Sequence, residues 1–157
     1  MSVPSYKDRL KSTIIRVSRS ILAEEGLDGL QARRVAKLAD CSVGTIYNLF
    51  GSLDMVAIAA NAETLSELQA ELLRANRTTA SLEEQLDALA IAYLSFAINR
   101  KSEWRAIFEH RFSTKTMVPE WYRESQRELF AIVEQILAPT IVAQETRQEA
   151  ARALFSA

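Results

Sequence analysis

Apolar residues recur every three or four positions through most of the chain. Between Leu10 and Ile21 they advance by four, three and four residues, which is one face of an amphipathic helix over about 5–25. The same periodicity predicts further helices over 32–39, 43–49, 53–75, 82–99, 101–112, 119–137 and 141–157. Four Gly and three Pro interrupt the pattern at few places, so we predict an all-α fold.

Residues that start and stop helices support these boundaries. Gly26 is placed to end the first helix, and Ser42 can accept a hydrogen bond from a free amide at the start of the third. Ser81 and Glu84 have the spacing of a capping box, and Pro119 opens a later helix. The two short helices on either side of Ser42 therefore have the outline of a helix-turn-helix.

Composition and charge agree with a globular helical protein. The 157 residues are 48% hydrophobic and 25% charged, enough for one ordinary domain or two small ones. The net charge is −1, but residues 1–50 hold eight basic and five acidic side chains, whereas the remainder holds eleven and fifteen. A basic first third fits a nucleic-acid contact in that region, although an excess of three charges also arises by chance.

The stretch GLDGLQARRVAKLADCSVGTIYNLFGSLDMV resembles the N-terminal DNA-binding region of the TetR family of bacterial transcriptional regulators. The resemblance is close over residues 10–56. Beyond them it rests on the all-helical layout and on an aromatic run between 104 and 112. The shared features are Gly26, Val35, Ala36, Ala39, Ser42, Gly44, Thr45, Ile46, Tyr47, Phe50 and Ser52.

The resemblance implies an N-terminal three-helix DNA-binding head, which we place at 1–52, and an antiparallel helical ligand-binding and dimerisation body at 53–157. Family members typically bind palindromic operators as homodimers, repress transcription and dissociate when a small ligand enters the body. We expect the same here, with double-stranded DNA, a second copy and a small apolar or aromatic molecule as partners. The alternative is a ligand-binding or dimer-forming helical module whose DNA binding is weakened.

The resemblance also assigns roles in the predicted recognition helix. Val43, Gly44 and Tyr47 match base-contacting positions, with Val43 able to contact a thymine methyl group. Thr45 and Asn48 match phosphate-contacting positions, which fix register more than sequence. The alternative makes Tyr47 a core aromatic residue and Val43 an ordinary surface residue. The predicted DNA-binding residues are Gln31, Arg33, Arg34, Ser42, Val43, Gly44, Thr45, Tyr47 and Asn48.

Four positions depart from the residues that are usual in the family. Gln31 stands where Thr is usual, Asp40 where Gly is usual, Leu49 where His is usual and Leu53 where Lys is usual. Leu53 removes a cation and Asp40 adds an anion, which should weaken DNA binding and flatten its salt dependence by about 0.9 per lost phosphate contact. The cations that can compensate are Lys7, Arg9, Lys11, Arg33, Arg34 and Lys37.

Aromatic residues recur at helical spacing in the predicted body. Such stripes usually form a core, but between helices they also line apolar pockets. Both roles remain open for these residues. We predict a ligand pocket formed by Tyr93, Trp104, Phe108, His110 and Trp121.

The sequence lacks the residue patterns of an enzyme or a metalloprotein. The single histidine, His110, adjoins Glu109 in sequence, so the two point to different faces of a helix. The single cysteine, Cys41, is best read as a small buried thiol. No phosphate-binding glycine loop, two-histidine metal spacing or nucleophile elbow occurs, so we predict no catalytic residue, cofactor or metal.

No run approaches 18 apolar residues, and the N-terminus MSVPSYKDRLKS lacks the apolar centre of a signal peptide. We therefore predict a cytoplasmic protein with no membrane partner.

The dimer contact is expected in the last helices. The family builds its dimer mainly from two C-terminal helices, so we expect the interface to use 120–157. After Pro139 the apolar residues suffice for only one helix, and that pattern runs to Ala157 without a polar or glycine stop. We therefore expect a further C-terminal helix to follow it in the complete protein.

Overall fold

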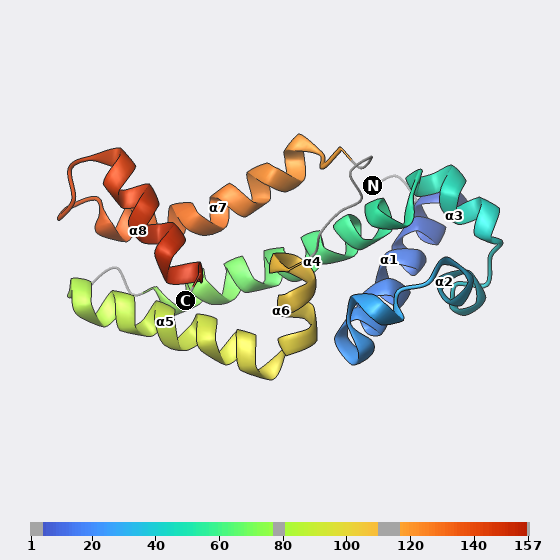
Figure 1. The fold of residues 1–157 in the computed structure, drawn as a ribbon, viewed down its shortest axis with the longest axis horizontal. Helices are drawn as coiled ribbons and strands as arrows, with labels where there is room; N and C mark the ends of the chain where they lie inside the picture. The colour runs from blue at the N-terminus through green and yellow to red at the C-terminus, as the bar shows by residue number, and fades with distance from the viewer. Residues whose placement is uncertain (1–4, 77–80, 110–116, 157) are drawn as a thin grey trace. The chain divides into compact units, whose positions relative to one another are not determined.

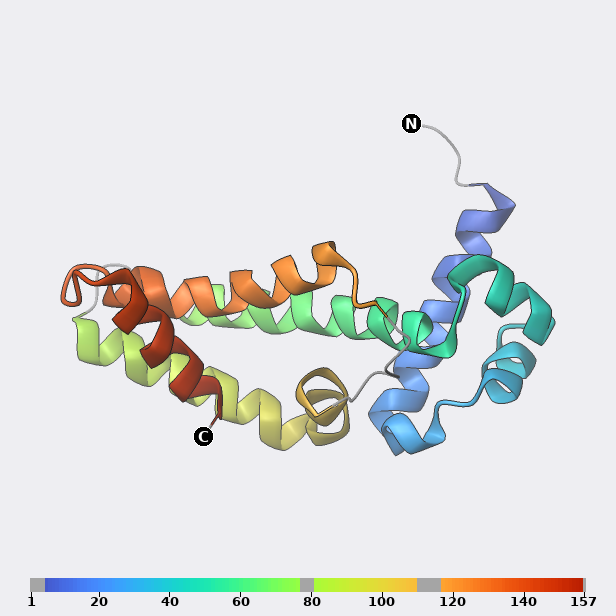
Figure 2. The same ribbon diagram turned by 45° about the horizontal axis from the view of Figure 1, so that its top comes forward.

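The computed structural model describes residues 5–76, 81–109 and 117–156, apart from the side chains of 154–156. Within these ranges the chain folds into helices and contains no strand (Figures 1 and 2), which confirms the all-α prediction. The elements in chain order are α1 (Tyr6–Glu25), the 3₁₀ helix η1 (Leu27–Gly29), α2 (Ala32–Leu38), α3 (Val43–Phe50), α4 (Leu53–Ala75), α5 (Leu82–Asn99), α6 (Lys101–Phe108), α7 (Glu120–Leu137) and α8 (Gln144–Ser156).

Local side-chain chemistry sets most of the helix ends. Ser42 Oγ accepts the Thr45 amide at 3.0 Å, and Ser52 Oγ accepts the Met55 amide at 3.1 Å. Ser81 and Glu84 form the predicted capping box at the start of α5, which lowers the pKa of Glu84 because the Ser81 amide and hydroxyl favour its ionised form.

Three boundaries differ from those predicted from periodicity. α6 ends at Phe108, with Glu109 in a turn, and residues 110–112 lie outside the described part of the chain. α8 begins at Gln144 because 141–143 are extended instead. The Arg147 side chain donates to the carbonyl oxygens of Ile141 and Val142, at 2.7 Å and 2.9 Å, which holds that segment against the helix start.

The chain divides into two compact units. The first unit comprises Met1–Thr64 and Arg100–Val118, and the second comprises Leu65–Asn99 and Pro119–Ala157. The long helix α4 contributes its first part to one unit and its last part to the other. The boundary after residue 52 between the proposed head and body remains a prediction from the family resemblance.

The first unit has a core of small and branched aliphatic residues from α1, α2, α3, α4 and α6. Burying each such branched side chain contributes about 1.5–3 kcal/mol before the entropy cost is subtracted. The buried members are Ile14, Val17, Ile21, Leu22, Leu30, Val35, Ala36, Ala39, Ile46, Val56, Ala57, Ala60 and Ala106.

The second unit packs α5 and α8 against α7, as Figure 2 shows. The Gln69 side chain on α4 also donates to the Ser125 carbonyl on α7 at 2.6 Å. The buried apolar residues of this unit are Leu65, Leu68, Leu72, Leu89, Tyr93, Phe96, Tyr122, Leu129, Ile132, Val133, Ile136, Leu137 and Ala151.

Among the described residues, no single helix combines the length and apolar character needed to cross a membrane, and only the bent pair of α3 and α4 meets both criteria together.

Candidate nucleic-acid interface

The turn between α2 and α3 is fixed by the backbone as well as by the core. Val35, Ala36 and Ile46 are all buried and hold the two short helices together. The Cys41 amide donates to the Ala36 carbonyl at 3.0 Å, which closes the end of α2 in the manner of a Schellman motif. Asp40 lies between them with φ of 51°, in the left-handed region that favours glycine.

The outer face of α3 is exposed at the predicted DNA-binding positions. Tyr47 is 45% exposed, and Gly44 and Asn48 are also exposed, whereas Ile46 is fully buried. Tyr47 is therefore not a core residue. A Cβ added at Gly44 would meet only the Ser42 hydroxyl, at 3.6 Å, an ordinary contact. Folding therefore does not require glycine at position 44.

Two other residues of α3 are less free than the sequence suggested. Val43 is half-buried and packs against the core of the first unit, because it begins the helix where α3 rests on the head. The Thr45 hydroxyl lies 2.8 Å from the Ser42 hydroxyl, so each already has a polar partner. Phe50, expected to be buried, is half-buried at the rim of the same core.

The cations predicted to contact DNA fall into two groups. Arg34 on α2 is bound through both terminal nitrogens to the Glu25 carboxylate at the end of α1. This pairing lowers the pKa of Glu25 and raises that of Arg34. Arg33 and Lys37 are exposed and make no ion pair within the described residues. Gln31 precedes α2 with an exposed side chain that forms no capping hydrogen bond.

The departures from the family pattern have distinct structural settings. Leu49 and Leu53 are half-buried against the head core, so their apolar side chains serve packing. Beside Asp40, burial and the Asp40 charge raise the pKa of the Cys41 thiol, which keeps it protonated near neutral pH.

The predicted ligand residues are not gathered into one described cavity. Tyr93 on α5 is buried and Trp121 on α7 is 48% exposed, both in the second unit. Trp104 and Phe108 belong to α6 in the first unit, with ring centroids 5.3 Å apart. His110 lies outside the described residues. The pocket formed by these side chains therefore remains a prediction.

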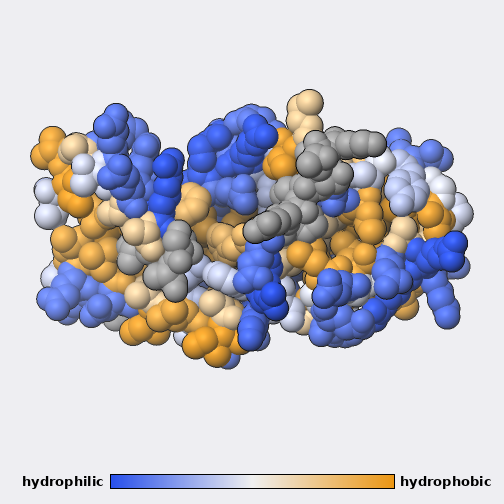
Figure 3. Space-filling view, viewed as in Figure 1, coloured by the Kyte–Doolittle hydropathy of each residue, from blue (hydrophilic) through white to orange (hydrophobic). Residues whose placement is uncertain are grey.

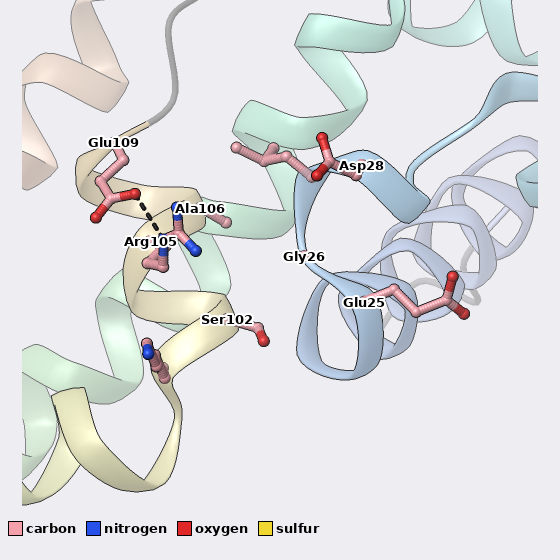
Figure 4. A pocket seen from close by; sticks show the side chains of 9 residues that line it. Glu25, Gly26, Asp28, Ser102, Arg105, Ala106 and Glu109 are labelled. Carbon is pink, nitrogen blue, oxygen red and sulfur yellow. Dashed lines mark hydrogen bonds and ion pairs between the residues drawn. The ribbon is translucent and has the colours of Figure 1, made fainter.

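A polar groove that sequence reasoning missed lies within the first unit, between the end of α1 and α6 (Figure 4). Its volume is about 260 Å³, and Asp28, Ser102 and Arg105 are among its lining residues. Arg105 pairs with Glu109 at 2.6 Å, while the Glu25 carboxylate points away from α6. No local pattern announces this groove, because residues about 75 positions apart in sequence form its two walls.

α6 is also tied to α4 inside the first unit. The buried Asn61 side chain on α4 donates to the Ala106 carbonyl at 2.7 Å. A lone asparagine within the apolar run AIAANAETL was the available sequence signal, because a buried amide needs a hydrogen-bond partner.

A second groove, of about 270 Å³, lies between α4 and α7 in the second unit, with Leu73, Ala131 and Ile132 in its walls. In the part of the chain that the structure describes, no three His, Cys, Asp or Glu side chains gather as metal ligands.

Known proteins resemble this chain in both sequence and fold. Residues 14–60 match the family model described as bacterial regulatory proteins, tetR family. No curated protein sequence matches the chain. A tetR-family regulatory protein from Rhodococcus RHA1 has 17% identity and a TM-score of 0.69, over 94% of this chain and 80% of that one.

Two further solved structures have the same fold. A TetR transcriptional regulator from Legionella pneumophila has 14% identity and a TM-score of 0.60, over 99% of this chain and 84% of that one. The multidrug binding protein EbrR, complexed with imidazole, has 17% identity and a TM-score of 0.56, over 98% of this chain and 97% of that one.

Proposed function

The chain is a transcriptional regulator of the TetR family with a DNA-binding helix-turn-helix, and from this premise we propose that it is a ligand-responsive repressor. It binds a roughly palindromic operator as a homodimer, and a small apolar molecule releases it. The observation that carries the DNA half is the outer face of α3, where Gly44, Tyr47 and Asn48 are exposed on a helix anchored by buried Ile46.

Gly44 supports close approach of DNA to α3. Glycine disfavours a helix by about 1 kcal/mol relative to alanine. The fold leaves room for a Cβ at position 44, so packing does not explain the glycine. A DNA backbone or base lying directly against α3 does explain it, because a methyl group would then separate the two surfaces.

The charge pattern supports a modest electrostatic contribution. Arg33 and Lys37 can reach phosphates without breaking an ion pair, whereas Arg34 must exchange the Glu25 carboxylate for a phosphate. Asp40 in the turn opposes phosphate binding. We therefore expect the logarithm of operator affinity to fall with the logarithm of salt concentration with a slope of a few units, at about 0.9 per phosphate.

Variants of the exposed face test the DNA proposal. Gly44→Ala should leave the free energy of unfolding unchanged or raise it, yet lower operator affinity by about tenfold or more. Replacing both Thr45 and Tyr47 by alanine should cost at least about 1 kcal/mol of operator affinity. Fluorescence anisotropy with labelled operator measures both, and Ile91→Ala, on a different helix, is the control. Wild-type affinity in Gly44→Ala and in the double variant would exclude this docking of α3.

The regulatory half rests on weaker support. EbrR is a multidrug binding protein, and this chain shares its fold, which supports a small-molecule ligand here. We propose that Tyr93, Trp104, Phe108, His110 and Trp121 contribute to its site. Only a ligand that prefers one of two conformations can change operator affinity.

Tryptophan fluorescence provides the ligand test, because Trp104 and Trp121 are the two tryptophans of the chain. We expect some compounds in a panel of apolar and aromatic molecules to change the fluorescence and also to lower operator affinity. Trp121→Phe shows which tryptophan responds. Compounds that bind without altering operator affinity would count against the regulatory role.

One second function has an observation in its favour. The anion at Asp40, the apolar Leu53 and the pairing of Arg34 with Glu25 all reduce the positive charge that is available to DNA. These features favour a ligand-binding or dimer-forming module with weakened DNA binding. Absence of specific binding at low salt, where electrostatic attraction is strongest, would select this function instead.

A further inference from the structure

α5 exposes a row of large aliphatic side chains along one face. Ile91, Leu94 and Ile98 are 66%, 54% and 74% exposed, and their spacing of three and four residues places them on a single stripe. Figure 3 shows hydrophobic surface gathered along the lower edge of that view, where Figure 1 places α5. A contiguous exposed apolar stripe of this kind marks an interaction surface.

The other helices of the second unit are different. The exposed residues of α7 are charged or polar apart from Trp121, and those of α8 up to residue 153 are polar apart from Ala153. Among the described residues of this unit, the apolar surface suited to burial is therefore on α5, not on the last two helices from which the family resemblance implies the dimer.

We propose that the stripe on α5 (Ile91, Leu94 and Ile98) packs against the same stripe of a second copy, with the two helices antiparallel about a two-fold axis at Leu94. In that arrangement Leu94 meets Leu94 of the second copy, and Ile91 lies beside Ile98. A two-fold contact of this kind closes on itself and stops at a dimer. The proposal rests on the homodimer proposed above and specifies its surface.

Charge complementarity favours a second copy as the occupant. Asp87 lies seven residues before Leu94, and Lys101 lies seven residues after it. Both are exposed, and neither makes an ion pair within the described part of the chain. The chain alone keeps Lys101 within about 11 Å of Ile98. An antiparallel pair centred on Leu94 therefore brings Asp87 of each copy near Lys101 of the other, twice by symmetry.

The shape of the stripe also points to a protein partner. Small-molecule sites are concave, whereas this stripe follows the outward face of a helix. The apolar segment from Ile91 to Ile98 is about 10 Å long. A contact of that size falls below the roughly 800 Å² per partner of a standard interface, so we expect a dimer of micromolar strength.

Sedimentation equilibrium without DNA tests the contact independently of the DNA-binding proposal. Wild-type protein should be a dimer at tens of micromolar. Leu94→Asp should raise the dissociation constant by about a hundredfold, because two carboxylates would then meet at the axis. Leu73→Asp, at a leucine on α4 that is 56% exposed, should have no effect. Circular dichroism checks that each variant keeps its helix content.

A charge exchange tests the antiparallel register. Asp87→Lys and Lys101→Asp should each weaken the dimer by about threefold to tenfold, because each places like charges together twice. The double variant should restore wild-type association. A monomeric wild-type protein, a dimer indifferent to Leu94→Asp, or a double variant weaker than both single variants would overturn the proposal. A dimer lost only through changes in α8 would assign the contact to the C-terminal helices instead.

Discussion

The helix-turn-helix and the aromatic helices of the chain place their candidate functional residues in contrasting ways. The predicted DNA-binding residues of α3 are neighbours in sequence, and the exposed face of one short helix presents Gly44, Tyr47 and Asn48 together. The predicted ligand residues are spread over α5, α6 and α7 and over both compact units. A surface built by one helix follows from local sequence, whereas a pocket depends on how several helices pack.

The largest expected effect concerns the anchor of α3. Ile46 is fully buried, so Ile46→Ala should lower the free energy of unfolding by about 2–5 kcal/mol, through lost apolar contacts and the cavity left behind. Ile91→Ala makes the same chemical change at a site that is 66% exposed and should cost less than about 1 kcal/mol in the monomer. Denaturant titration of both at low protein concentration makes the comparison. Equal losses would show that α3 is not anchored as described.

Periodicity and capping residues were sufficient to predict the helices. The stripe from Leu10 to Ile21 and the cap residues Ser42 and Ser81 fixed element type and most ends, because both act within a few residues of themselves. The early end of α6 at Phe108 was not predictable, since its aromatic spacing continues past the end of the regular helix.

Tertiary features were harder to predict from sequence. The sequence could not show that Val43 packs on the head core or that Arg34 pairs with Glu25, because both depend on how α2 and α3 meet α1. The exposed face of α5 was also missed, since a stripe of Leu and Ile reads as core until the packing is known.

Loss of the α3 cap should have the next largest effect. Ser42→Ala removes the acceptor of the Thr45 amide and should cost about 1 kcal/mol of stability. Because Thr45 also loses its hydroxyl partner, operator affinity should fall as well. Ser42→Asn keeps a capping oxygen and should retain most of the stability. Thermal unfolding of both variants checks this, and equal destabilisation by Ala and Asn would remove the cap as the cause.

A change at Asp40 separates backbone strain from charge. Asp40→Gly should stabilise the fold by about 0.5–1 kcal/mol, because glycine adopts the left-handed conformation more readily. It should also strengthen DNA binding by removing an anion. Asp40→Asn removes the charge but keeps a side chain, so it should share the gain in affinity and little of the gain in stability. An affinity gain in Gly but not in Asn would show that the charge is irrelevant.

The smallest expected effect is the pH dependence of the Glu25–Arg34 pair. Arg34 holds the pKa of Glu25 below its ordinary value of 4.5, so the pair stabilises the fold above that value. This contribution is lost as the pH falls through the lowered pKa. Wild type should therefore be slightly more stable than Glu25→Gln at neutral pH, and the difference should vanish below about pH 4. Unfolding curves at several pH values test this, and a difference that persists in acid would point to another cause.

Selection of bound genomic fragments by the purified protein, at a stated ionic strength of about 0.15 M, tests the central claim most directly. The account predicts enrichment of a short sequence in two inverted copies, with centres about one helical turn or a small multiple of it apart. Protein with Gly44→Ala and Tyr47→Ala should lose this enrichment while keeping its helix content. Enrichment of no sequence by the wild-type protein, or of the same sequence by the variant, would contradict the claim that α3 reads DNA.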